Sequence, residues 1–97
     1  MVKHIILWQL KDEIQGEEKE KVKAGIKEGL AGQIPGLIDI KVQTECLASS
    51  NADVMLDSTF VDETALKTYA SHPAHVNVAD TKVRPYTKTR VCMDYEV

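Results

Sequence analysis

Apolar and polar residues alternate in four segments of the chain, namely residues 2–12, 36–47, 54–61 and 87–97. Successive side chains of a strand point to opposite faces, so this alternation predicts four strands. In the first strand, one face carries Val2, His4, Ile6, Trp8 and Leu10. The opposite face is also apolar at its centre, where Ile5 and Leu7 lie. A strand that is apolar on both faces needs cover on both sides.

Two segments between these strands have helical spacing. The segment of residues 16–36 is rich in helix formers. It is predicted to contain one amphipathic helix that stops before Pro35. Gly29 lies on its inner face, and a glycine there costs about 1 kcal/mol relative to alanine, so we expect close contact with the sheet or room for a ligand. Residues 63–71 form a second, shorter helix with Asp62 as its N-cap, and Pro73 ends it.

The order strand, helix, strand, strand, helix, strand is that of a ferredoxin-like α+β subunit. Such a subunit has a four-stranded sheet with helices on one face only. The other face is left open, and the apolar side chains on both sides of the first strand favour covering it with a second copy of the chain. The pattern therefore predicts a homodimer in which two sheets pair.

Composition narrows the class of protein. The chain has 97 residues, which suits a single domain spanning residues 1–97. Its net charge is only -3 and its basic residues are scattered, so we expect no nucleic-acid partner. It lacks an apolar run long enough to cross a bilayer and a signal peptide, which predicts a cytoplasmic protein with no membrane partner. Cys46 and Cys92 are then expected to stay reduced.

The stretch "TYASHPAHVNVAD", residues 68–80, concentrates the candidate chemistry. His72 precedes Pro73 and is placed to cap a new helical turn, which is a complete structural explanation for it. Across this break, His75 and Tyr69 can face the same space. A histidine can move a proton at neutral pH, and a tyrosine hydroxyl can hydrogen-bond a carbonyl oxygen that gains charge. The pair therefore suits enolisation, aldol closure or isomerisation, although a helix end with packed side chains explains the same residues.

Other polar residues add less. His4, Ile6 and Trp8 share the helix-facing side of the first strand, where they either fill the core or line a pocket with His72 and His75. The pair His72 and His75 has the i,i+3 spacing of half a metal site, but a zinc site needs more nitrogen or sulfur ligands than the nearby sequence supplies. We expect no metal, and no glycine loop for a phosphate-bearing cofactor is present, so we expect no cofactor.

Three stretches resemble the stress-responsive A/B barrel (Dabb) family of dimeric α/β barrels. They are "VKHIILWQLKD" at the start, "IPGLIDIKV" after the first helix and "YASHPAHV" after the second. The last, as Tyr-x-x-His-Pro-x-His, is the most specific. The resemblance covers nearly the whole chain and implies one domain of this family over residues 1–97, with a ferredoxin-like subunit paired into a dimeric barrel.

The family includes olivetolic acid cyclase, which closes a linear polyketide by an aldol reaction. The resemblance implies that Tyr69 and His75 are catalytic and that His4 lines the pocket. It departs from the cyclase at Val54, where the cyclase has another pocket histidine, and at Trp8, which replaces a smaller residue. The pocket shape, and hence the substrate, is therefore not expected to transfer.

Two classes of function follow. One is an acid/base cyclase or isomerase acting on a keto-containing metabolite, a polyketide cyclase-like lyase or isomerase. The other is a non-catalytic, stress-related dimer that binds a small apolar ligand. Haem or oxygenase chemistry ranks third, because fold analogy alone does not establish a reaction.

Overall fold

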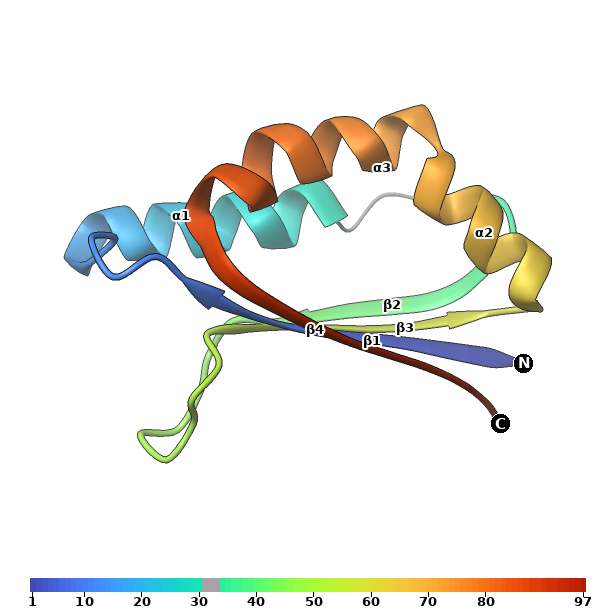
Figure 1. Ribbon diagram of the computed structural model, residues 1–97, viewed down its shortest axis with the longest axis horizontal. Coiled ribbons are helices and arrows are strands. Elements are labelled where there is room, and N and C mark those ends of the chain that lie inside the picture. The colour runs from blue at the N-terminus through green and yellow to red at the C-terminus, as the bar shows by residue number, and fades with distance from the viewer. Residues whose placement is uncertain (31–33) are drawn as a thin grey trace.

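One antiparallel sheet carries the molecule. The computed structural model describes residues 1–30 and 34–97, and in this part of the chain the strand order is β2-β3-β1-β4. The strands are β1 (Val2–Leu10), β2 (Leu37–Gln43), β3 (Val54–Phe60) and β4 (Thr87–Glu96). All helices lie on one side of this sheet (Figure 1). The predicted ferredoxin-like α+β fold is therefore confirmed.

The centre of the sheet is β1, which pairs with β3 on one side and β4 on the other. Its even-numbered side chains face the helices and are buried, as the alternation predicts. Within this register His4 lies between Ser58 on β3 and Asp94 on β4. The Ser58 Oγ donates a 2.9 Å hydrogen bond to the His4 carbonyl oxygen, which adds a side-chain tie to the ladder at this point.

The first helix, α1 (Gly16–Leu30), packs its apolar stripe on the sheet. Its buried residues are Val22, Ile26 and Leu30, which share one face of the helix at i, i+4 and i+8. Gly29 makes room for a helix rather than for the sheet, because a Cβ built there would lie 2.8 Å from Cγ1 of Val78. The expected end of this helix, beyond residue 30, falls on residues 31–33, which lie outside the described residues.

The second helix, α2 (Glu63–Ser71), has the predicted bounds and cap. The Asp62 carboxylate accepts a 2.8 Å hydrogen bond from the Ala65 backbone N–H. His72 ends α2 and also begins α3 (Pro73–Val78), since its Nδ1 accepts a 3.2 Å hydrogen bond from the Ala74 backbone N–H. The capping role inferred for His72 from its place before a proline is therefore confirmed.

The helical path continues beyond α3, which the sequence did not predict. A short π-helix, η1 (Ala79–Val83), and a short 3₁₀ helix, η2 (Arg84–Tyr86), follow α3 and lead into β4. This segment runs beside α1 above the sheet (Figure 1). Val83 of this segment is buried in the core, and the segment forms one wall of a cavity that Trp8 also lines.

The face of the sheet opposite the helices carries a row of exposed apolar side chains on β4 and β1, beside polar ones such as the ion pair of Lys3 and Asp57. Its exposed side chains include Leu7, Val91, Met93 and Tyr95. Val91 and Met93 are 64% and 66% exposed in the single chain. Among residues 1–30 and 34–97, no helix has the length and apolar character needed to cross a membrane.

Candidate functional site

Tyr69 and His75 meet across the break between α2 and α3. Their ring centroids lie 4.1 Å apart with the rings tilted by 39°. Tyr69 is only 2% exposed, and its hydroxyl is buried without a hydrogen-bond partner among the described residues. A buried polar group without a partner is uncommon and calls for an explanation, such as a role in binding or chemistry.

Burial sets the protonation of both side chains. Removal from water raises the pKa of Tyr69 to about 12, so its hydroxyl stays protonated and can donate. Removal from water also lowers the pKa of His75, and the positive charges of protonated His4 and of Arg84 add to this effect. His75 is therefore neutral at pH 7, with one ring nitrogen free to accept a proton. The pair combines a persistent donor with a persistent acceptor.

Two cavities meet at His75. The smaller holds about 80 Å³ and lies between α1 and α3, with Tyr69 in its wall. The larger holds about 550 Å³ and lies between η1 and the sheet, lined by Ile6, Trp8 and Arg90 among others. A water molecule occupies roughly 30 Å³ of liquid, so the smaller cavity accommodates a functional group and the larger one a small molecule.

His4 packs against Tyr69 but lines a third cavity, of about 490 Å³, along β4. Its ring stands edge-on to Phe60 and Tyr69, at centroid distances of 6.4 and 6.3 Å. Its Nδ1 contacts the Asp94 carboxylate, with which it forms an ion pair when protonated. The third cavity and the 550 Å³ cavity share Ala70 and Arg90 as wall residues. His4 and His75 thus line neighbouring cavities rather than one.

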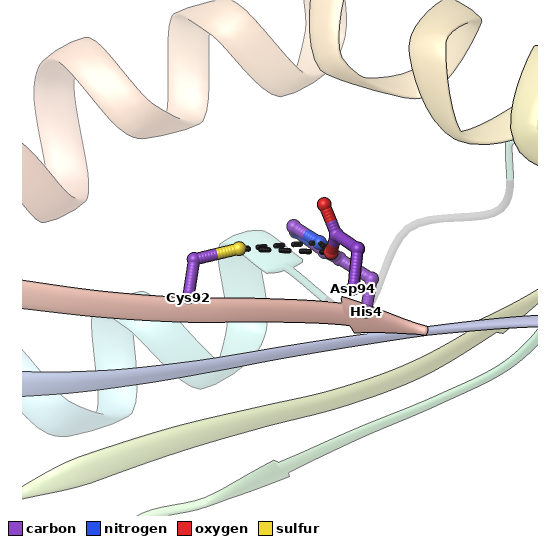
Figure 2. A group of neighbouring side chains, drawn as sticks. All are labelled: His4, Cys92 and Asp94. Carbon is purple, nitrogen blue, oxygen red and sulfur yellow. Dashed lines mark hydrogen bonds and ion pairs between the residues drawn. The ribbon is translucent and has the colours of Figure 1, made fainter. Parts of the chain in front are cut away.

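Cys92 joins His4 and Asp94 in a cluster on the helix-facing side of the sheet. Figure 2 shows the three side chains converging from β1 and β4. The Cys92 sulfur lies 3.7 Å from His4 Nδ1 and 3.6 Å from Asp94 Oδ1. Burial and the Asp94 carboxylate raise the pKa of the Cys92 thiol.

The six residues singled out from the sequence therefore occupy four different places. Tyr69 and His75 are in contact, and Ile6 and Trp8 lie in the wall of the larger cavity next to His75. His4 faces β4, and His72 caps α3 through its ring nitrogen.

Sequence reasoning missed Arg90, Cys92 and Asp94. The available signal was the alternation in β4, because these polar residues occupy the face that is apolar on β1 and β3. A polar set on the inward face of a strand indicates a wet cavity rather than a packed core.

This fold and site define a ferredoxin-like α+β protein with ligand-sized cavities between its sheet and its helices. The chain belongs to the family described as the stress responsive A/B barrel domain, whose model matches residues 2–97. The family resemblance found in the sequence is therefore confirmed. Among curated proteins, none matches this sequence.

Several solved structures share the fold. A dimeric protein of unknown function from Bacteroides fragilis is 32% identical, with a TM-score of 0.90 over 99% of this chain and 95% of its own. A Dabb family protein from Mesorhizobium loti is 20% identical, with a TM-score of 0.79 and coverage of 99% and 95%. A hydroxynitrile lyase from Passiflora edulis is 16% identical, with a TM-score of 0.73 and coverage of 97% and 90%. The last two likenesses establish the fold alone.

Proposed function

We propose that the protein is an acid/base enzyme that enolises a keto-containing small molecule, as a cyclase or an isomerase does. The observation that carries the proposal is the contact between the rings of His75 and Tyr69, together with the buried Tyr69 hydroxyl that has no hydrogen-bond partner among the described residues. His75 removes a proton from the carbon next to the carbonyl, and the Tyr69 hydroxyl donates to the carbonyl oxygen as it gains negative charge. The proton on His75 then returns to carbon or oxygen to complete the turnover.

The two cavities at His75 would hold different parts of the substrate. The body of the molecule occupies the larger cavity beside Trp8, whose indole offers a flat apolar surface. Only the carbonyl end enters the smaller cavity, where Tyr69 lies. Because His75 lines both, it stands at the carbon that links the two parts.

Arg90 favours a substrate that carries a carboxylate. Its side chain lines the larger cavity and contributes to lowering the pKa of His75, so its positive charge is felt at the site. Arg84 and Lys88 line the same cavity but pair with Asp80 and Asp12, respectively. We therefore propose an aromatic or apolar keto acid as the substrate class.

Exchange of the benzylic protons of phenylpyruvate in D₂O, followed by NMR, tests this function. We expect the wild-type protein to accelerate exchange, and His75→Gln to reduce the acceleration by about 100-fold or more. Tyr69→Phe removes one donor to the developing oxyanion and is expected to cost about 100-fold. The control variants His72→Asn, which keeps an N-cap acceptor for α3, and Tyr95→Phe change a histidine and a tyrosine outside the pair and are expected to retain full activity.

Substrate charge gives a second comparison. Phenylpyruvate is expected to react faster than its methyl ester, and Arg90→Gln is expected to remove most of that preference. Equal acceleration by wild type and His75→Gln would exclude the acid/base assignment. In that case, binding of phenylpyruvate detected by calorimetry and unchanged in both Tyr69→Phe and His75→Gln would favour the alternative, a non-catalytic binding protein.

We also propose that two chains pair through the open face of the sheet. The support is the row of exposed apolar side chains on that face and the likeness to the dimeric protein from Bacteroides fragilis. An apolar sheet face of this kind is usually covered in the working assembly.

A further inference from the structure

We infer that His4, Cys92 and Asp94 form a binding site for a divalent transition metal, with zinc as the best fit. The three residues offer one nitrogen, one sulfur and one oxygen, and the three atoms lie within 4.8 Å of one another. This combination of donors is typical of zinc, which takes Cys, His and carboxylate ligands.

The distances fit a tetrahedral ion. Zinc bonds of roughly 2.3 Å to sulfur and 2.0–2.2 Å to nitrogen or oxygen place sulfur about 3.6 Å from each of the other ligands. The observed separations from the Cys92 sulfur are 3.7 Å to His4 Nδ1 and 3.6 Å to Asp94 Oδ1. Only the direct His4–Asp94 contact has to open, to roughly 3.3 Å, when a metal replaces the proton between them.

The surroundings hold His4 in place and let Asp94 adjust. The His4 ring is buried and packs in T-shaped contacts against Phe60 and Tyr69, and its Nδ1 contacts Asp94 on β4. Cys92 and Asp94 come from alternate positions of β4 and therefore point to the same side (Figure 2). The Asp94 side chain is 46% exposed and has room to move back from His4.

The 490 Å³ cavity reaches all three residues and leaves one coordination position open. A metal with three protein ligands and an open fourth position binds water or a substrate oxygen there, whereas a structural zinc site is closed by four protein ligands. The inferred site is therefore open to solvent. Neither Tyr69 nor His75 is among its ligands, so metal binding is tested separately from the proposed enolisation.

Cobalt titration of the metal-free, reduced protein tests the site directly. Tetrahedral Co²⁺ bound to a thiolate gives a strong near-ultraviolet charge-transfer band, which reports the sulfur ligand itself. We expect this band to saturate at one Co²⁺ per chain and to disappear when Zn²⁺ displaces the cobalt. Cys92→Ser is expected to abolish the band, whereas Cys46→Ser, which changes the other exposed free cysteine, is expected to keep it.

The other two ligands are tested by affinity. Asp94→Asn is expected to keep the thiolate band but to weaken Co²⁺ binding by more than about tenfold, while the control Asp80→Asn binds as wild type does. His4→Gln is expected to weaken binding similarly, with His72→Gln as its control and circular dichroism as the check of folding. The inference is overturned if wild type gives no band, if the band persists in Cys92→Ser, or if Asp94→Asn binds as tightly as wild type. A phenylpyruvate assay run in a chelator separates this outcome from that of the proposed function.

Discussion

At the scale of single residues, His75 illustrates how burial changes chemistry. A solvated histidine is partly protonated near neutral pH, but this one is half-buried and lies near positive charges. Both influences disfavour the imidazolium, so the His75 ring is neutral at pH 7 and can act as a base. Tyr69 experiences the same burial with the opposite result, since its neutral form is the protonated donor.

The lowered pKa of His75 predicts how stability responds to acid. The unfolded chain, with a histidine pKa near 6.5, binds the proton more readily than the folded one, so the free energy of unfolding falls as pH drops below about 6.5. We expect His75→Gln to lose less stability than wild type between pH 7.5 and pH 5.5. Urea denaturation at the two pH values measures this difference, with His72→Gln as the control. An identical pH dependence in wild type and His75→Gln would contradict it.

The sequence predicted some residue positions and not others, for a physical reason. The alternation in β3 correctly predicted the buried faces of Val54, Leu56 and Phe60, because strand geometry follows directly from sequence spacing. The cluster of His4 with Cys92 and Asp94 was not predicted, since these partners are 88 and 90 residues apart and only the pairing of β1 with β4 joins them. Counting nitrogen and sulfur ligands alone also left the carboxylate out.

At the scale of elements, the contact between α1 and α3 depends on a glycine. A methyl group at Gly29 would come within 2.8 Å of the stiff, β-branched Val78, whereas one at Gly25 would meet only the Lys82 Cδ at 3.9 Å. The two glycines share one helix and differ in what faces them. They therefore form a matched pair for separating helix propensity from packing.

We predict opposite effects for alanine at these two positions. Gly25→Ala is expected to stabilise the protein by up to about 1 kcal/mol, because alanine has the higher helix propensity. Gly29→Ala gains the same propensity, but the overpacking costs about 1–3 kcal/mol, so we expect a net loss of stability. Urea denaturation of the two variants measures both values. Equal stabilisation of both would mean that α3 moves away from α1 without cost.

The path from α3 to β4 was the element that sequence reasoning missed. The sequence predicted a new helical turn at Pro73 and a last strand from residue 87, but it assigned no element to the residues between them. In the structure Pro73 opens α3, where its missing N–H costs nothing, and Pro85 falls within the 3₁₀ helix η2. By contrast, α2 was predicted to the residue because Asp62 and Pro73 mark its two ends.

At the scale of the whole molecule, helices cover one face of the sheet and leave the other face, called the bare face below, exposed in the single chain. Cover for the bare face is the reason to expect a dimer, and it also bears on stability, because a chain of this size buries limited surface alone. If dimer formation supplies part of that burial, the melting temperature rises with protein concentration.

Charge on the bare face is expected to separate the subunits. Met93→Asp places a carboxylate at the centre of the proposed interface, and sedimentation at micromolar concentration should then detect a monomer instead of the wild-type dimer. Leu47→Asp is the control, since Leu47 is 81% exposed and lies in the loop between β2 and β3. A wild-type protein that sediments as a monomer would refute the proposed pairing.

Trp8 gives the protein an internal optical reporter. It is the only tryptophan in the sequence, it is 5% exposed, and its indole lines the cavity beside His75. Tryptophan emission therefore originates from a single position, and that position is in the wall of the proposed substrate cavity. An aromatic molecule entering the cavity changes that emission without any label, so the occupancy of the site can be followed in the unmodified protein by the colour and intensity of its own fluorescence.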